Sequence, residues 1–368
     1  MVTGDRDVLD RRALNRSLLA RQLLLERVDV PAVRAVGHLV GMQAQAPDPP
    51  YIGLWTRLAG FRIEDLADRV RAREVVRLVL MRGTIHLVTA QDCLALRPVL
   101  RGALEQGLKG TFGRKLAGLD TAEVAALGRE LVEKEPLTLG GLGTLLAERW
   151  PDRDPFALAN AVRNLVPLVQ VPPRGLWGES GQAVHTTAES WLGGTLAEST
   201  SPDAMVERYL AAFGPATVKD IQTWSGMTRL ADSVNRLRPR LRTFRDENGL
   251  ELLDLPDAPR PDPGMPVPVR FLPEFDNILL SHADRSRTLT DEQRALVFTR
   301  NGLIRSTFLV DGFVRGLWRI EQARKAATLV IEPFGALSRE DRDAVAEEGG
   351  SLLAFAAASA TTRDIRFG

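Results

Sequence analysis

Apolar side chains recur at helical spacing along the first part of the chain, and two β-rich runs follow them. The predicted elements are helices over 11–26, 31–40 and 63–71, then strands over 75–80 and 84–88. The strands surround Arg82-Gly83, which predicts a tight turn. Three helices followed by a β-hairpin are the order of a winged helix.

The same order recurs twice. In the second group, Asp120 with Glu123 forms a capping box, and Asp154 precedes Pro155 at a helix start. This group predicts helices over 120–134 and 139–150 and a third from 154, then strands over 165–172 and 183–187. The third group predicts helices over 203–213, 216–225 and 227–238, then a hairpin of 241–244 and 250–255.

A Pro-rich stretch separates the remainder, where β-rich runs dominate and two further capping boxes start helices. The runs are 269–272, 303–310, 312–320 and 327–331, and the boxes are Thr290 with Gln293 and Ser338 with Asp341, the second starting a helix to 359. We therefore predict an α+β fold that is mainly helical. Its expected segments are a winged helix in each of 1–118, 119–196 and 197–256, a linker over 257–268, and an α+β segment over 269–368.

Composition describes an ordinary globular protein. The chain has 368 residues, 44% hydrophobic and 26% charged, with a net charge of +1. A polar start over 1–10 and the lack of a long apolar run predict a cytoplasmic protein without a membrane span. Cys93 is the one cysteine, no histidine pair has metal spacing, and no glycine-rich phosphate loop is present. We expect no metal and no cofactor.

Arginine is strongly favoured over lysine. The 48 basic residues include five lysines, which leaves 43 arginines. Codon bias of a GC-rich genome explains such a preference, but arginine is also the side chain best shaped to hold phosphate. Tandem winged helices favour a nucleic-acid partner, with a protein-interaction scaffold as the alternative.

Two stretches are candidates for phosphate contacts. Five arginines cluster in the third group: Arg236, Arg238, Arg240, Arg242 and Arg245. They would form a phosphate-binding stripe if exposed, and Arg240 and Arg242 are its central members. The polar segment 282–287 predicts an exposed loop whose Arg285 and Arg287 could reach DNA. A solvated surface is the alternative for both stretches.

Two glutamines, Gln43 and Gln45, flank Ala44 at the end of a helical pattern. The prolines that follow, up to Pro50, predict that the helix stops there. Because a buried amide needs several hydrogen-bond partners, two amides beside a turn suggest a lined cavity. A pair of helix-end caps is the alternative.

The chain resembles the AlkZ/YcaQ-like winged-helix DNA glycosylases over nearly its whole length. The matching motifs are Leu14-Asn15-Arg16, Gly41-Met42-Gln43-Ala44-Gln45-Ala46-Pro47, Leu80-Met81-Arg82-Gly83-Thr84-Ile85-His86-Leu87, Phe213-Gly214-Pro215-Ala216-Thr217, Trp224-Ser225-Gly226 and Leu272-Pro273-Glu274-Phe275-Asp276-Asn277. The resemblance implies that Gln43 and Gln45 are catalytic, as in the AlkZ branch. The YcaQ branch has aspartate in place of Gln45. Family members excise N-alkylated purines, including crosslinked ones, and some protect producers of DNA-alkylating antibiotics.

The chemistry of an amide pair agrees with that resemblance. Glutamine cannot act as a general base, because its amide does not titrate near neutral pH. An N7- or N3-alkylated purine is already cationic and leaves as a neutral base, so amide oxygens need only align water and face the developing charge. The motif holds no lysine, so we expect no Schiff base and no strand-cleaving lyase step. A crosslinked lesion favours an open cleft over a closed base-flipping pocket.

The resemblance also implies that Thr84 and His86 line the cleft and contact DNA, although a strand histidine is more often packed in the interior. His38 and His185 are interpreted as structural. Together these observations predict a monofunctional DNA glycosylase for bulky or crosslinked N-alkylpurines, acting in base excision repair or antibiotic self-resistance. We expect a monomer bound to double-stranded DNA in a cleft between three winged helices, nucleoid-associated when bound. The alternative is a non-catalytic winged-helix regulator or lesion binder.

Overall fold

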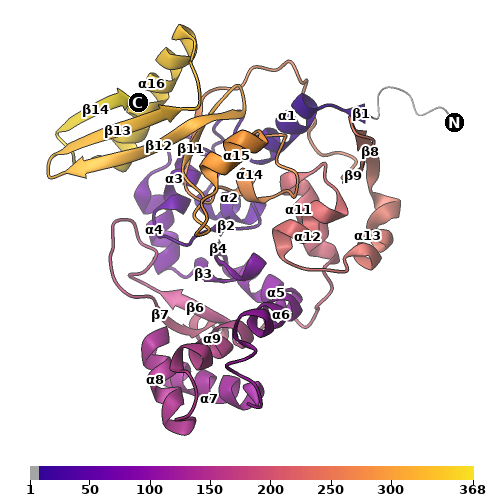
Figure 1. Cartoon of the computed structure of the whole chain (residues 1–368), viewed down its shortest axis with the longest axis vertical. Helices are drawn as coiled ribbons and strands as arrows, with labels where there is room; N and C mark the ends of the chain where they lie inside the picture. Colours follow the sequence, from indigo (N-terminus) through magenta and orange to yellow (C-terminus); the bar gives the residue numbers. More distant parts are fainter. Residues whose placement is uncertain (1–7) are drawn as a thin grey trace.

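The computed structural model describes residues 8–368, and residues 1–7 of the polar N-terminus lie outside the described part. The fold is mixed α+β, as expected (Figure 1). Its first part contains a short strand, helices and a hairpin: β1 (Val8–Leu9), α1 (Arg11–Arg21), α2 (Ala32–His38), β2 (Met42–Gln43), α3 (Pro49–Trp55), α4 (Ile63–Arg71), β3 (Val75–Val79), β4 (Ile85–Thr89), α5 (Ala90–Val99) and α6 (Arg101–Phe112).

The middle of the chain forms the unit at the bottom of Figure 1. Its elements are α7 (Thr121–Lys134), β5 (Leu137–Thr138), α8 (Leu139–Arg149), α9 (Pro155–Leu165), β6 (Leu168–Val171), β7 (Val184–Thr187) and α10 (Ala188–Leu192). Asp120 and Asp154 cap α7 and α9, which confirms both predicted helix starts. Leu108 and Leu116 join side chains of α7–α9 in a hydrophobic core separate from the main one.

The first two hairpins are part of one sheet. β3 pairs with β6 through Arg77 opposite Gln170 and Leu78 opposite Val169. The resulting six-stranded sheet has the order β2-β4-β3-β6-β7-β5. Every residue of β3 is buried, so this strand lies inside the molecule and both of its edges are paired. The two wings expected from the sequence therefore meet edge to edge.

The third group of helices and strands is α11 (Asp203–Phe213), α12 (Val218–Ser225), α13 (Ala231–Leu237), β8 (Arg242–Asp246) and β9 (Glu251–Asp254). β1 pairs parallel to β8 and completes a three-stranded sheet. Each of the three groups thus shows helices followed by an antiparallel hairpin. The assignment of these groups as three tandem winged helices, and the boundaries of the five segments, stay predictions.

The C-terminal part is a twisted sheet with a helix against it, drawn in orange and yellow in Figure 1. Its elements are β10 (Arg270–Leu272), α14 (Asn277–Leu280), α15 (Asp291–Val297), β11 (Thr307–Val310), β12 (Phe313–Ala323), β13 (Ala326–Pro333), α16 (Arg339–Ala356) and β14 (Thr362–Phe367). The strand order is β10-β11-β12-β13-β14. Gly349 lets α16 lie close to Leu329 of β13, since a Cβ there would approach that side chain to 2.7 Å.

Helix α1 is bound by ion pairs and hydrogen bonds to segments more than 200 residues later in the chain. The Arg21 guanidinium forms a buried bidentate ion pair with Asp254 at 2.6 and 2.9 Å. Arg12 and Arg16 both pair with Asp311, and Arg16 also donates to the carbonyl of Met265. The predicted linker has no regular structure, but these bonds hold it against α1. The main hydrophobic core accordingly runs through residues of the first, third and C-terminal parts.

Several predicted boundaries were wrong for identifiable reasons. The first helix ends at Arg21 rather than residue 26, because Leu23 has a positive φ of 57°. Pro49 and Pro50 begin helix α3 instead of extending a loop, since proline fits the first helical positions. The capping box of Thr290 with Gln293 is present as predicted.

Candidate active site and nucleic-acid interface

Gln43 lies on a sheet edge rather than at a helix end. The chain leaves α2 through Val40 and Gly41, whose φ values are 54° and 89°, and enters the two-residue strand β2. A side chain at Gly41 would meet Val88 at 2.6 Å, so only glycine allows this close approach. In β2, Gln43 pairs directly with His86 of β4. The alternative of helix-end caps is therefore wrong for Gln43.

Arg82 joins the two side chains of this pair. Its Nη2 donates to Gln43 Oε1 at 2.8 Å and approaches His86 Nε2 at 3.3 Å, and its Nη1 donates to the carbonyl of Trp224. Arg82 has a φ of 57°, and Gly226 after α12 packs against its backbone. The sequence indicated a turn at this position but gave no signal that its guanidinium would bind the side chain of Gln43.

His86 is buried, with 2% of its surface exposed. Burial, and next the charge of Arg82, lower the pKa of His86 to about 3. The ring is therefore neutral at physiological pH. Its Nδ1–H donates a hydrogen bond to the carbonyl of Thr84 at 3.0 Å, so Nε2 is left to accept one from Arg82. The sequence predicted that His86 lines a cleft, but the ring is buried and contacts the Arg82 guanidinium. The Thr84 hydroxyl donates to the carbonyl of Met81 within the turn.

Gln45 is exposed, unlike Gln43. Its Oε1 accepts from the backbone N–H of Ile85 at 3.3 Å, which holds the side chain against β4. The intervening Ala44 is completely buried, and its carbonyl accepts from Arg77 at 2.5 Å. Each glutamine oxygen thus uses one of its two lone pairs on the protein and keeps the other for a second donor.

A second segment is fixed beside the glutamines. Asp276 forms a buried bidentate ion pair with Arg57, with both N–O distances 2.9 Å. Asn277 donates to the carbonyl of Gly41 at 2.9 Å. Residues 272–277 therefore cannot shift without disturbing the turn into β2.

A basic cleft of about 530 Å³ opens next to Arg82. It lies between the β3–β4 turn, α6, α9 and the link between α12 and α13, and its polar lining includes Gln106, Asn160, Arg163, Asn164 and Thr228. Within the part of the chain that the structure describes, no Asp or Glu lines this cleft. Arg163 is half-buried, and within residues 8–368 its guanidinium forms no hydrogen bond or ion pair. An acid-free cleft with an unpaired guanidinium is suited to an anion.

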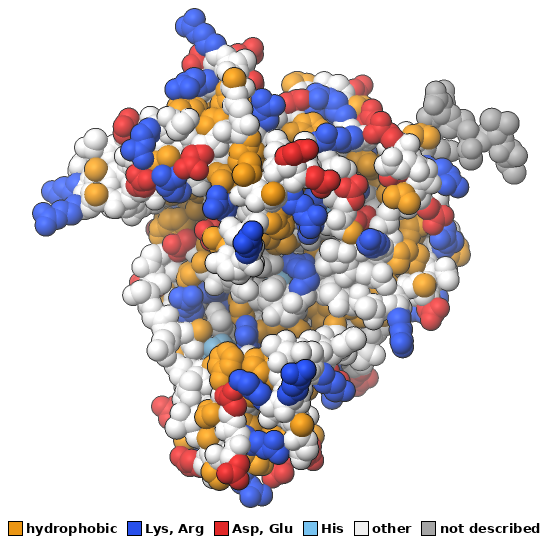
Figure 2. All heavy atoms as spheres, viewed as in Figure 1, with side chains coloured by type: hydrophobic (Ala, Val, Ile, Leu, Met, Phe, Trp, Pro, Cys, Tyr) orange, Lys and Arg blue, Asp and Glu red, His pale blue; other side chains and the backbone are white. Residues whose placement is uncertain are grey.

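The predicted arginine stripe is exposed but largely paired with carboxylates. Arg236 pairs with Asp203, Arg238 with Glu251, and Arg240 with Glu207 at 2.9 Å. Arg242 stacks over the Phe244 ring, with its guanidinium carbon 4.6 Å from the ring centroid. Figure 2 shows blue and red side chains interspersed over this side of the molecule. The carboxylates reduce the positive potential that the stripe alone would produce.

The segment 282–287 is exposed only at Asp284 and Ser286, which corrects the prediction of an exposed loop whose arginines reach out. His282 and Arg287 have 1% and 6% of their surface exposed. Arg287 donates to the carbonyl of Pro215 at 2.9 Å, so its guanidinium is a packing contact. Arg285 is half-buried and donates to the carbonyl of Leu279. Its charge is close enough to Arg82 to lower the pKa of that guanidinium, after desolvation, to about 10.

Other candidates lie away from the glutamines. His185 on β7 is buried, and burial lowers its pKa to about 4. His38 donates a hydrogen bond from Nε2 to the carbonyl of Arg21 at 2.6 Å. The burial of His185 and the hydrogen bond of His38 agree with the structural roles predicted for them. Among residues 8–368, no cluster of three metal-ligating side chains occurs, and no helix is long and apolar enough to cross a membrane.

A family model described as "DNA glycosylase AlkZ-like" matches residues 36–355. The chain therefore belongs to the AlkZ-like family of DNA glycosylases. It is 25% identical to an interstrand DNA cross-link repair glycosylase of Streptomyces sahachiroi, with 91% of this chain and 93% of the relative aligned.

A solved structure shares the fold. The DNA glycosylase AlkZ of Streptomyces sahachiroi superposes with a TM-score of 0.81 at 20% identity, covering 98% of this chain and all of that one. At this level of identity the superposition supports the architecture alone. It agrees with the mixed α+β fold described above.

Proposed function

We propose that the protein is a monofunctional DNA glycosylase that hydrolyses the N-glycosidic bond of cationic N7- or N3-alkylated purines. The observation that supports this most is the arrangement of two neutral amides, Gln43 buried and held by Arg82, Gln45 exposed and held by Ile85. The relative with 25% identity is named for repair of interstrand crosslinks. Bulky or crosslinked lesions are accordingly the proposed substrates.

The chemistry requires a placed water and stabilisation of an oxocarbenium-like sugar. In this proposal, the free lone pairs of Gln43 and Gln45 align the water and face the positive charge as it develops. Their amide N–H groups donate to sugar or phosphate oxygens. Arg82 holds Gln43 in place and is a positioning residue, while neutral His86 holds Arg82. The motif 41–47 includes no lysine, so the proposed reaction ends at the abasic site without a lyase step.

DNA phosphates need a surface beside the amides. We place the phosphate contacts in the basic cleft, where, among the residues that the structure describes, Arg163 has no ion-pair partner and no carboxylate lines the wall. Arg240 and Arg242 remain a second candidate surface, and Arg285 lies near Arg82. A phosphate at Arg240 must compete with Glu207, whereas a phosphate at Arg163 displaces no protein group.

The test is single-turnover release of 7-methylguanine from duplex DNA, with enzyme in excess. Gln43→Ala and Gln45→Ala should each slow release by about 10- to 1000-fold, the usual range for losing one preorganised dipole. Gln45→Asp should be milder, because a carboxylate can hold the same water and oppose the sugar's positive charge. Unmodified guanine should stay uncleaved. Wild-type rates in the double alanine variant would refute the catalytic role and leave a non-catalytic DNA or lesion binder.

The cellular role is proposed on the same basis. A glycosylase for bulky alkylpurines would act in base excision repair or in resistance of a cell to its own DNA-alkylating antibiotic. We propose a cytoplasmic monomer that associates with the nucleoid when bound to DNA. Sensitivity of a deletion strain to a bifunctional alkylating agent, restored by wild type and not by Gln43→Ala, tests this role.

A further inference from the structure

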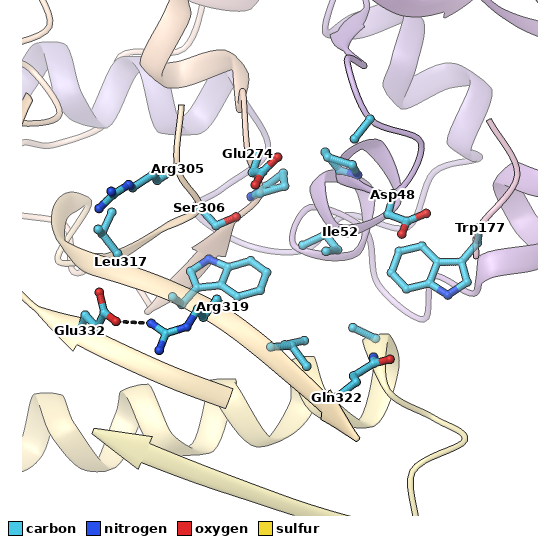
Figure 3. A pocket seen from close by; sticks show the side chains of 16 residues that line it. Asp48, Ile52, Trp177, Glu274, Arg305, Ser306, Leu317, Arg319, Gln322 and Glu332 are labelled. Carbon is cyan, nitrogen blue, oxygen red and sulfur yellow. Dashed lines mark hydrogen bonds and ion pairs between the residues drawn. The ribbon is translucent and has the colours of Figure 1, made fainter. Parts of the chain in front are cut away.

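A second cavity begins where the glutamine motif ends. It has a volume of about 730 Å³ and lies between α3, the loop after β10 and the strands β12 and β13 (Figure 3). Ala46, the residue directly after Gln45, is part of its lining. Ile52, Leu317 and Ile320 supply apolar surface. Cavities of this size hold small molecules larger than a single base.

Glu274 and Arg305 are the two charged side chains of this cavity that form neither an ion pair nor a hydrogen bond within residues 8–368, and Arg305 is the exposed one. Glu274 carries the negative charge. It is half-buried, and within residues 8–368 its carboxylate forms no hydrogen bond or ion pair. The neighbouring Glu332, by contrast, pairs with Arg319. The backbone next to Glu274 is fixed, because Asp276 is bound to Arg57 and Phe275 has a positive φ of 59°. A half-buried carboxylate held in this way favours a cation.

Trp177 forms an aromatic wall of the same cavity, next to Asp48 in Figure 3. Its ring packs edge-on against Tyr51, with the centroids 5.5 Å apart, and at a tilt against Phe355, with the centroids 5.7 Å apart. The Tyr51 hydroxyl donates to the carbonyl of Gly175, two residues before Trp177. The indole is therefore held on two sides, and a fixed aromatic surface can bind an apolar or cationic group at little entropic cost.

We propose that this cavity, the lesion-arm pocket, binds the cationic or aromatic substituent of a bulky alkylated purine whose base lies at Gln43 and Gln45. The inference rests on the proposed function. It adds a binding site for the part of the lesion that extends from the base. Glu274 pairs with positive charge on the arm, Trp177 packs against its apolar part, and Ala46 marks the point where the arm passes from the glutamines into the pocket.

The experiment compares three duplexes that differ only in the N7 substituent of one guanine. The substituents are methyl, a linker ending in a benzyltrimethylammonium group, and the same linker ending in a neutral tert-butylbenzyl group. Wild type should have a higher kcat/KM for the charged arm than for methyl. Glu274→Gln should lower that preference on the order of tenfold, through KM, while the neutral arm loses nothing. Trp177→Ala should lower kcat/KM for both arms relative to the methyl substrate.

The matched control is Glu130→Gln, which removes an exposed carboxylate on α7, outside the pocket. It should keep the wild-type preference. If Glu274→Gln slows the charged arm and methyl equally, Glu274 acts on the reacting bond and the lesion-arm pocket is refuted. Equilibrium binding of the same duplexes separates the two proposals. A wild type that releases no base but prefers the charged arm, with Glu274→Gln abolishing this, would refute the proposed reaction and support the pocket.

Discussion

From the burial of His86 we predict how strongly the free energy of unfolding depends on pH. An unfolded histidine has a pKa near 6.5, whereas burial beside Arg82 lowers the pKa of His86 in the folded protein to about 3. Between these values the unfolded state binds more protons, so stability rises with pH and is lost as pH falls. From pH 7 to pH 5, the unfolded histidine goes from mostly neutral to almost fully protonated. The folded state should therefore lose about 2 kcal/mol of unfolding free energy from this one group.

The perturbation is His86→Gln, measured by urea unfolding at pH 7 and pH 5. The variant should show about 2 kcal/mol less acid destabilisation than wild type between the two values. His185→Gln is the matched control, because burial lowers the pKa of His185 to about 4 and predicts nearly the same reduction. The two variants should differ in excision. His86→Gln should slow 7-methylguanine release by roughly 10- to 100-fold through misplaced Arg82, while His185→Gln should not.

The pH profile of excision adds an independent check. Because His86 stays neutral, the wild-type release rate should show no step from this ring between pH 5 and pH 8. An equal loss of stability from pH 7 to pH 5 in wild type and His86→Gln would refute the depressed pKa. A step in the rate near pH 6.5 that disappears in the variant would show instead that the ring titrates in the active protein.

Three further predictions concern the neighbouring contacts. Arg82→Lys should slow excision on the order of tenfold, since one ammonium cannot hold Gln43 and the Trp224 carbonyl as a fork does; a wild-type rate would remove Arg82 from the mechanism. Arg163→Gln should reduce the salt dependence of duplex binding by about 0.9 in the log–log slope, and Arg240→Gln by less; the reverse order would favour the stripe. Asp276→Asn should lower the unfolding free energy by about 3 kcal/mol, measured with urea, and an unchanged value would contradict the buried ion pair.

Much of the secondary structure could be predicted, because its signals are local. Asp154 and Thr290 mark helix starts within three residues of the groups that they cap. Prolines are ambiguous in this respect, and Pro49 begins a helix where a break was expected. The pairing of β3 with β6 depends on residues far apart in the chain, so no local pattern shows that two hairpins share one sheet.

The candidate site was predicted in part. The motif drew attention to Gln43 and Gln45, but the sequence could not show that Arg82 reaches Gln43 from a turn 39 positions away. Likewise, the arginine stripe suggested unpaired positive charge, because the carboxylates that pair with it lie elsewhere in the chain. Glu207, for example, pairs with Arg240 from helix α11. Arg163 belongs to no motif, and we propose a role for it because its guanidinium has no partner within residues 8–368.

The ion pairs of helix α1 have a consequence for how the chain folds during synthesis. Arg21 and Asp254 are 233 positions apart. At roughly 5–20 residues per second, on the order of tens of seconds pass before the ribosome delivers the carboxylate that Arg21 needs. The α7–α9 unit has its own core and can fold within that interval. The nascent first helix must meanwhile remain outside its final burial site, so the interval before Asp254 emerges is when a chaperone should bind the growing chain.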